Sequence, residues 1–485
     1  MDTSLAILSD EAMPLIPDDD GYTLVGNDVL DQCIDKTTKS TVHVVSLAMG
    51  NAADAVEIIC VGYIMSEMNG ITTRDKELLS AAVFIGMLLG GLLCGILSDR
   101  IGRKPCLQYS LFLNALAGLA SAAAPNITWL IIFRVVGGIG IGGSVPSVFT
   151  LGAEVFPSSI RGRMLSVIAS FWMVGAIYTG LTGWLMLGKD FSGHRIMPGL
   201  SWRWFAAICS LPAIIALILT TFVLPESPRY LVGKGKFKEA AAVLSDMSGM
   251  AVYPHNLEQA DRYSQSHSVD KRANSSSSSV SITSIQELTI LHLFRPELIR
   301  TTVNIMLIWF TLSFGSYGLS TWITVLFEDI GMGNVYASAF IFALANLPGN
   351  LVSIVYMDRI GRRRLLTGGM VLAAFSAVGF AEGASHPPVV ILCATLFNAF
   401  SVAGWNALDC LSVENFPTEV RTTAMGVLAA SGRVGAVCAQ FVNGTLEKNV
   451  PLLLFVTSGC MFVGGVAARF TARDETGRAL TDHTL

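Results

Sequence analysis

Three polar side chains interrupt the first long apolar stretch of the sequence at intervals of three residues. Asn51, Asp54 and Glu57 lie within residues 43–66, where most other side chains are apolar. On a helix, residues three apart lie on neighbouring strips of one face. Two carboxylates there can bind a cationic solute or carry a proton, because a low dielectric favours the uncharged form of a carboxylic acid. The alternative is a structural pair with a base from another segment.

Basic residues inside other apolar stretches are candidate partners for these acids. Arg134 lies in the fourth apolar stretch and is the candidate partner of Asp54 or Glu57. If such a pair rearranges, it couples protonation to a change of conformation; if it stays fixed, it is a structural ion pair. Asp409 and Arg433 form a second acid–base set in the C-terminal part of the chain. Because polar groups at membrane depth are costly, we predict that these residues face a wet cavity.

The composition indicates which elements position these groups. Of the 485 residues, 52% are hydrophobic and 14% are charged, whereas a soluble globular domain carries about 25% charged residues. A helix needs about 20 apolar residues to cross a bilayer. Twelve such stretches are predicted, at residues 43–66, 78–97, 106–124, 128–150, 164–187, 202–224, 300–327, 335–356, 366–384, 388–411, 424–445 and 450–470. We therefore predict an all-α membrane protein with twelve transmembrane helices in two pseudo-symmetric six-helix bundles.

Two motifs recur at nearly the same spacing, which indicates two homologous halves. The run Asp99–Arg103 (Asp-Arg-Ile-Gly-Arg) recurs at Asp358–Arg362, 259 positions later. The motif Glu154–Arg161 is matched by Glu414–Arg421, 260 positions later. Parallel repeats of six helices place a substrate site between the halves, near the middle of the membrane.

The predicted spans divide the chain into five parts. These are an N-terminal tail (1–42), an N-terminal six-helix bundle (43–229), a polar linker (230–298), a C-terminal six-helix bundle (299–470) and a C-terminal tail (471–485). The short loops on one side hold ten Lys and Arg residues, against six on the other. Because basic loops stay in the cytosol, we predict that this side, the linker and both tails are cytosolic.

Several motifs resemble those of the major facilitator superfamily. Gly95–Lys104 resembles its signature in loop 2–3, and Pro225–Arg229 resembles the signature of its sugar and organic-ion branch. Across residues 43–470 the chain also resembles the synaptic vesicle glycoprotein 2 family and its SVOP-type relatives. The motifs that carry this resemblance are Ala53–Glu57, Gly138–Pro146, Phe171–Gly175, Trp309–Phe314, Tyr317–Leu319, Leu347–Asn350 and Trp405–Asp409. The short loop at residues 328–335 lacks the long luminal segment of the vesicle glycoproteins, which favours an SVOP-type or early-branching relative.

The resemblance implies which helices surround a central cavity. Aromatic walls pack a ligand in such cavities, and a few polar groups orient it. Trp172 and Trp405 are the aromatic candidates, although a tryptophan can instead face lipid or the membrane interface. The full set of predicted solute- and proton-binding residues is Asn51, Asp54, Glu57, Arg134, Trp172, Tyr178, Tyr317, Asn398, Trp405, Asn406, Asp409 and Arg433.

The resemblance also implies that the repeated loop motifs control access to the cavity. Their acids and arginines are expected to join helix ends through ion pairs and helix-terminus interactions, which hold one state and break in the other. The predicted gating residues are Asp99, Arg103, Glu154, Arg161, Asp358, Arg362, Glu414 and Arg421. The alternative is that the arginines serve only to keep these loops in the cytosol, which would explain the arginines but not the acids.

These features predict a secondary transporter of a small organic solute that works by alternating access. An organic cation or zwitterion is favoured, and coupling to protons is expected. The alternative is a vesicle-membrane binding or trafficking protein that transports little. HExxH, GxSxG and Walker patterns are not apparent in the sequence, so we predict neither an enzyme nor an ATP-driven pump. The scattered cysteines predict no metal site, no cofactor is expected, and the net charge of −4 gives no reason to expect nucleic acid.

The N-terminal tail holds a candidate address signal. Glu11, Leu15 and Ile16 fit an acidic dileucine motif of the kind that a sorting adaptor recognises. Short patterns of this sort also occur by chance. The motif favours a vesicular or endosomal membrane, with the plasma membrane as the alternative, and we expect a monomer in the bilayer.

Overall fold

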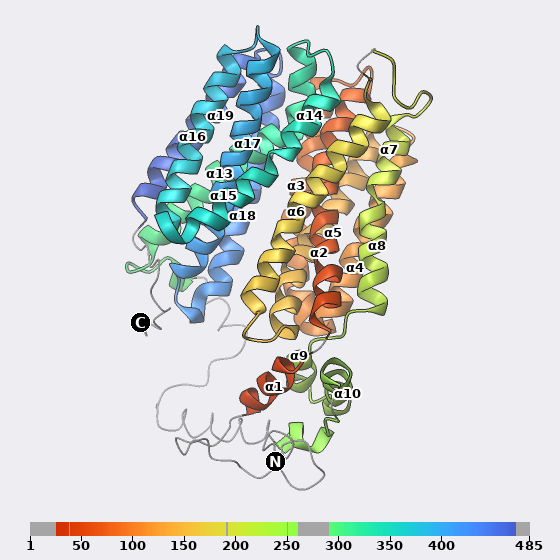
Figure 1. Ribbon diagram of the computed structural model, residues 1–485, viewed down its shortest axis with the longest axis vertical. Helices are drawn as coiled ribbons and strands as arrows, with labels where there is room; N and C mark the ends of the chain where they lie inside the picture. The colour runs from red at the N-terminus through yellow and green to blue at the C-terminus, as the bar shows by residue number, and fades with distance from the viewer. Residues whose placement is uncertain (1–25, 38, 191–192, 250, 260–290, 472–485) are drawn as a thin grey trace.

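The computed structural model describes residues 26–37, 39–190, 193–249, 251–259 and 291–471. Within these ranges the chain forms helices and no β-strand. Eleven helical spans are long and apolar enough to cross a membrane, and α4, whose sequence is more polar, is the twelfth. The prediction of an all-α membrane protein with twelve membrane helices in two bundles is therefore confirmed (Figure 1). Glu11, Leu15 and Ile16 lie outside the described residues.

The N-terminal bundle contains six spans, of which the sixth is broken. They are α2 (Ser40–Glu67), α3 (Thr73–Ile101), α4 (Arg103–Ala122), α5 (Ile127–Val155), α6 (Arg161–Leu187), and α7 (Trp202–Cys209) followed by α8 (Leu211–Phe222). The sequence predicted one continuous helix for the sixth span. Pro212 explains the break at Ser210, because proline has no N–H to donate to the carbonyl of Ile208 four residues earlier.

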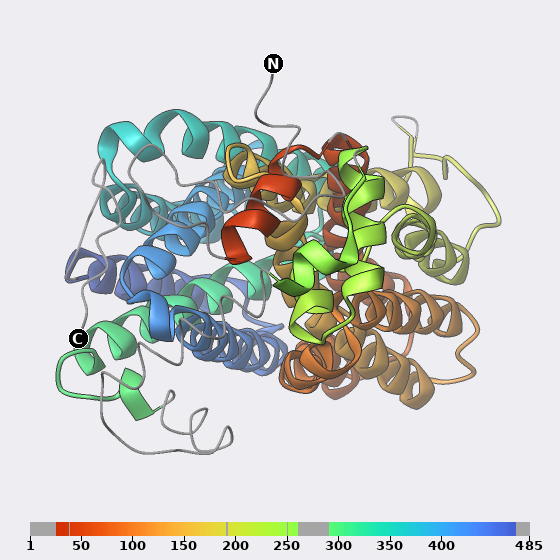
Figure 2. The ribbon, with the colours of Figure 1, turned by 90° about the horizontal axis from the view of Figure 1, so that it is seen from below.

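The C-terminal bundle also contains six spans, of which the second is broken. They are α13 (Ile299–Asp329), α14 (Val335–Leu344) followed by α15 (Asn346–Ile360), α16 (Arg362–Glu382), α17 (Pro387–Glu414), α18 (Thr418–Leu446) and α19 (Val450–Arg469). The break at Ala345 precedes Pro348, whose ring cannot continue the hydrogen-bond ladder. The two bundles stand side by side (Figure 2). They meet where α3 packs on α18, α6 on α14 and α2 on α13.

Close packing within the N-terminal bundle depends on glycine. α3 and α5 lie against each other along much of their length. A Cβ atom added to Gly138 of α5 would lie 3.0 Å from the Cα atom of Gly86 on α3. Small residues that let two backbones approach in this way are typical of helix contacts in membranes.

Three short helices lie beyond one end of the N-terminal bundle (Figure 1). They are α1 (Gly26–Asp35), α9 (Pro228–Gly233) and α10 (Phe237–Ser248). α1 packs its Leu30 and Ile34 against Leu244 of α10 in a small apolar cluster. α1 falls in the segment predicted as an N-terminal tail, and α10 falls in the predicted polar linker.

The molecule has two ends, a linker end and a distal end. The linker end holds the turns between α3 and α4 and between α15 and α16, and the short helices lie beyond it. Gly102 and Gly361 form these two turns with φ values of 113° and 95°, a region that side chains other than glycine rarely adopt. The distal end holds the turns at residues 68–72 and 447–449. The repeated motif thus has the same backbone geometry in both halves.

Candidate functional site

An ion pair inside the N-terminal bundle joins α2 to α5. Glu57 accepts a hydrogen bond from Nη1 of Arg134 at 2.6 Å, and the two side chains are 3% and 1% exposed. The same nitrogen donates to Sγ of Cys60 at 3.2 Å. Nε and Nη2 of Arg134 have no hydrogen-bond partner among the described residues. Removing one member of such a pair leaves an uncompensated buried charge, which is strongly destabilising.

Asp54 lies one turn away from Glu57 and has neutral partners. Ser144 of α5 lies 2.7 and 2.8 Å from its two carboxylate oxygens, and Nδ2 of Asn114 donates to it at 3.4 Å. Ser144 also lies 3.0 Å from the carbonyl oxygen of Ile141. A hydroxyl has one proton to donate, so Ser144 serves either the carboxylate or this carbonyl. The arrangement therefore suits both forms of Asp54. When Asp54 is ionised, its carboxylate accepts a hydrogen bond from the hydroxyl of Ser144. When Asp54 is protonated, it donates to Ser144, whose hydroxyl then donates to the carbonyl of Ile141.

The expectation that these acids line a wet cavity is not met in this conformation. Asp54, Glu57 and Arg134 are 0%, 2% and 0% exposed. Their environment is the helix contact between α2, α4 and α5, where the cost of burying charge is offset by the ion pair and the hydroxyl and amide donors. Solvent or solute reaches them only if these helices move.

An aromatic cluster, defined here as Phe84, Trp172, Tyr317, Trp405 and Trp309, forms where the halves meet. Its centre is Tyr317 of α13, whose ring lies 5.3 Å from Phe84 of α3, 6.2 Å from Trp172 of α6 and 5.6 Å from Trp405 of α17. Trp405 in turn contacts Trp309 at 5.3 Å. The two indole N–H groups donate to Ser316 and Ser412, at 2.9 Å each. The structure thus brings together three of the predicted aromatic residues; Phe84 and Trp309 were not among them.

Arg433 of α18 lies against this cluster. Its guanidinium carbon is 5.7 Å from the centre of the Tyr317 ring. It interacts electrostatically with Asp54 of the N-terminal half and with Asp409 of its own half. Asp409 is exposed, unlike the acids of α2. The charge of Arg433 thus acts on an acid of each half, and among the described residues no ion pair joins it to either acid.

Four predicted residues are held by neighbouring helices instead. Asn51 donates to the carbonyls of Ile168 and Ala169 at 2.9 and 3.1 Å, and Asn398 donates to that of Phe342 at 2.7 Å. Tyr178 donates at 2.9 Å to the carbonyl of Ile208, the group that Pro212 leaves without a helical partner. Asn406 donates to Asn350 and Ser353 of α15 at 2.9 and 3.1 Å. In this conformation these contacts fasten helices together.

At the linker end, the predicted gating residues form ion pairs within each half. Arg103 lies 3.0 Å from Asp99 and 3.5 Å from Glu154, and Arg362 lies 3.1 Å from Glu414. Glu226 of the motif after α8 accepts from the backbone N–H groups of Arg103 and Lys104, each at 3.1 Å.

The outer arginines of the two motifs also match between the halves. Nε of Arg161 donates to the carbonyl of Phe156 at 3.4 Å, and Nε of Arg421 donates to that of Phe416 at 3.3 Å. Both arginines therefore fasten the loop that precedes their own helix. The side chain of Asp358 lies outside the described part of the structure.

At the distal end, charged residues join the two halves, a feature that the sequence analysis missed. Lys76 of α3 forms an ion pair with Glu447 at the end of α18, and Thr73 donates to the same carboxylate at 2.9 Å. Glu67 of α2 accepts from Tyr336 of α14 at 2.9 Å. We call these contacts the distal latch. The spacing of residues in a single sequence holds no signal for pairs this far apart in the chain.

Comparison with known proteins places the chain among membrane transporters. The family described as "Sugar (and other) transporter" matches residues 27–482. Synaptic vesicle glycoprotein 2A of Rattus norvegicus is 27% identical over 552 aligned positions, covering 84% of this chain and 74% of the relative. Synaptic vesicle glycoprotein 2C of Homo sapiens is 26% identical, covering 85% of this chain and 76% of the relative.

Solved structures show the same fold. The xylose transporter XylE of E. coli, in a partially occluded inward open conformation, superposes with a TM-score of 0.70 at 18% identity, covering 90% of this chain and 100% of that one. Its inward open conformation gives a TM-score of 0.70 at 19% identity, covering 90% and 98%. At this identity the likeness concerns the fold alone.

Proposed function

This chain belongs to the sugar (and other) transporter family of the major facilitator superfamily, and from that premise we propose that it carries a small organic cation or zwitterion by proton-coupled alternating access. It is a multi-pass membrane protein of the secondary transporter class. The solute, the coupling ion and the roles of individual residues are the proposed part. In this proposal the solute binds where the aromatic cluster bridges the halves.

The position of Arg433 carries this proposal. Its guanidinium lies beside the ring of Tyr317, and its charge acts on Asp54 of one half and on Asp409 of the other without an ion pair to either among the described residues. Two acids and one base provide partners for the ammonium and the carboxylate of a zwitterion, or for a lone cation if Arg433 turns away. Aromatic rings add cation–π attraction for a positively charged group. The same residues span both halves, so a bound solute would favour one relative arrangement of the bundles over the other.

Asp54 is the proposed proton carrier. Glu57 is already engaged by Arg134 at 2.6 Å, and changing its charge would leave that arginine alone in the bundle. Asp54 contacts a hydroxyl and an amide, and Ser144 can exchange donor and acceptor roles with it through Ile141. A group that must alternate between two protonation states needs partners that tolerate both. Protonation of Asp54 would weaken its attraction to Arg433 and free that base for the solute.

Uptake into proteoliposomes tests this proposal. A panel of radiolabelled organic cations, zwitterions and neutral sugars is first screened by thermal shift, since a ligand that prefers the folded state raises the melting temperature. Solutes that bind are then assayed for uptake with and without a pH gradient. We expect gradient-driven uptake in the native protein, loss of the gradient effect in Asp54→Asn, and no change in the exposed control Asp246→Asn. Uptake in Asp54→Asn that still follows the gradient contradicts the coupling assignment.

The similarity to the synaptic vesicle glycoproteins favours a second candidate function. A chain 27% identical to one of them over most of its length could serve as a binding or trafficking protein of vesicle membranes and transport little. The same uptake assay separates the two candidates. Tight binding of a ligand without uptake, in vesicles whose protein is correctly oriented, favours the second.

A further inference from the structure

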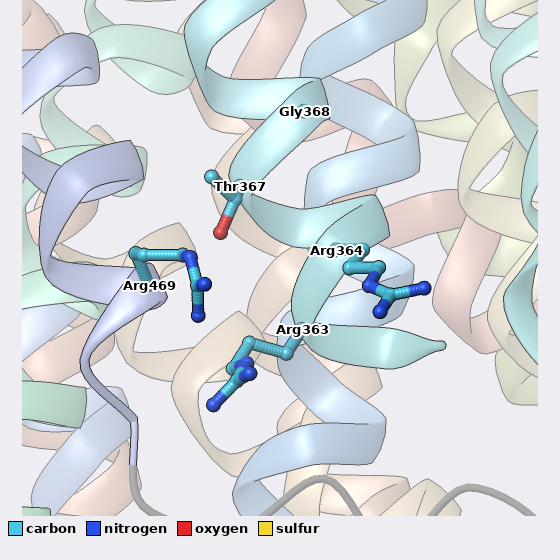
Figure 3. Close-up of a pocket in the computed structure, with 5 residues that line it drawn as sticks. All are labelled: Arg363, Arg364, Thr367, Gly368 and Arg469. Carbon is cyan, nitrogen blue, oxygen red and sulfur yellow. The ribbon is translucent and has the colours of Figure 1, made fainter. Parts of the chain in front are cut away.

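A pocket of about 330 Å³ lies at the linker end, between α16 and α19 of the C-terminal half. Its lining residues are Arg363, Arg364, Thr367, Gly368 and Arg469. Figure 3 shows the guanidinium of Arg469 and the hydroxyl of Thr367 directed into the space between the two helices, with Arg363 below them and Arg364 extending to the side. Gly368 leaves this space open, because an added Cβ atom would meet nothing within 4 Å. Three positive charges and no acid line the pocket.

Polar atoms of this pocket lack partners. Arg363 donates from Nη1 to the carbonyl of Thr471 at 3.2 Å. Its Nε and the Oγ1 atom of Thr367 are buried and have no hydrogen-bond partner among the described residues. Within the same part of the chain, Arg364 and Arg469 form no ion pair. A ligand that brings several acceptor oxygens would satisfy these donors, and phosphate groups match arginine in charge and geometry.

The helix faces that form the pocket continue as an apolar surface. On α16, Leu372 and Phe375 follow Gly368 at helical spacing and are 47% and 63% exposed. On α19, Val466 and Phe462 precede Arg469 at helical spacing and are 41% and 46% exposed. Residues three or four apart lie on one face of a helix. The basic pocket therefore opens onto apolar side chains that run toward the middle of the membrane, an arrangement for an amphiphile.

We propose that this pocket binds the phosphate headgroup of an anionic membrane lipid, whose acyl chains lie along the exposed faces of α16 and α19. The general enrichment of Lys and Arg in cytosolic loops explains why the residues at this position are positively charged. It does not explain a pocket between two helices, a buried hydroxyl and guanidinium nitrogen without partners, or the apolar surface above them. Basic pockets of this kind, between helices near the membrane surface, suit lipid headgroups. The site is separate from the proposed solute site and does not depend on it.

Thermal unfolding in nanodiscs of defined composition tests the proposal. The protein is embedded in phosphatidylcholine, with or without phosphatidic acid, whose headgroup is a phosphate monoester. We expect phosphatidic acid to raise the melting temperature of the native protein, and the double variant Arg363→Gln, Arg469→Gln to lose most of that shift. The matched control Arg300→Gln, Arg359→Gln removes two exposed arginines from the same half and end, and it should keep the shift. Thr367→Val, which changes no charge, should lose part of it.

Three outcomes would overturn the proposal. The first is a shift that persists in the Arg363/Arg469 variant, and the second is an equal loss in the Arg300/Arg359 control, which would indicate a general attraction between charged surfaces. The third is an equal shift in phosphatidylcholine nanodiscs on addition of inorganic phosphate, which would assign the pocket to a soluble anion. If the double variant does not fold, the comparison of Thr367→Val with the native protein decides between these outcomes.

Discussion

At the distal end of this molecule Lys76 of one half pairs with Glu447 of the other, whereas at the linker end Arg103 and Arg362 pair with acids of their own halves. The first kind of contact holds the two bundles together, and the second stiffens each bundle by itself. The distal end is therefore held closed in this conformation. Ion pairs near helix ends therefore have two separate uses here, and the ion pairs described for the repeated motifs lie within one half.

Breaking the buried ion pair between Glu57 and Arg134, which lies between the two ends, should have the largest effect. Arg134→Gln leaves Glu57 as an unpaired buried charge, and we expect a loss of roughly 3–5 kcal/mol in the free energy of unfolding. The measurement is chemical or thermal unfolding in detergent. The double variant Glu57→Gln, Arg134→Gln should lose less than Arg134→Gln alone. Equal stability of Arg134→Gln and the native protein would show that the pair contributes nothing.

Breaking the distal latch should have an intermediate effect. It should change the equilibrium between conformations more than the free energy of unfolding. The side chains of Lys76 and Glu447 are 19% and 10% exposed, so their pairing is less screened than a surface pair. We expect Glu447→Gln to lower the free energy that favours the closed distal end by about 1–3 kcal/mol. The readout is the labelling rate of a cysteine placed at Thr324, which is buried against α2 near the distal end. The rate should rise in Glu447→Gln and stay unchanged in the exposed control Lys448→Gln.

Breaking an exposed ion pair at the linker end should have the smallest effect, and it tests whether these pairs act on the distal end. Asp99 is 67% exposed, and exposed ion pairs are typically worth about 0–1 kcal/mol. Asp99→Asn breaks its pair with Arg103 and leaves the less exposed contact between Arg103 and Glu154 in place, so it should lower stability slightly and leave cysteine labelling at Thr324 unchanged. Arg100→Gln, which changes an exposed charge in the same turn, is the control. Faster distal labelling in Asp99→Asn would mean that the linker-end pairs also hold the distal end closed.

The sequence predicted the spans well because hydropathy over about 20 residues is a property of one segment. It predicted the breaks in two spans less well, since Pro212 and Pro348 break a helix whose hydropathy stays continuous. α1 was missed although its sequence carries a helical pattern, since Leu30, Cys33 and Ile34 lie at helical spacing and are buried. At the two breaks the missing information was local geometry and not composition.

The candidate site was predictable in its residue types but not in its pairings. Glu57 with Arg134 was one of two partners considered, and the structure selects it over Asp54. The contact between Ser144 and Asp54 was not predicted. The distal latch joins residues 371 positions apart, a separation about which one sequence holds no information. Whether these residues bind solute or protons stays a prediction.

Alternating access requires the two ends of the molecule to move in opposite directions, and distances between spin labels measure this. Spin labels at Asn69 and Lys448 report the distal separation of the halves, and labels at Arg163 and Arg359 report the linker-end separation; all four positions are exposed. Distances are measured in liposomes with and without a pH gradient. Alternating access requires a second population in which the distal pair is farther apart and the linker-end pair is closer. Distances that change in the same direction at both ends, or at neither, would contradict it.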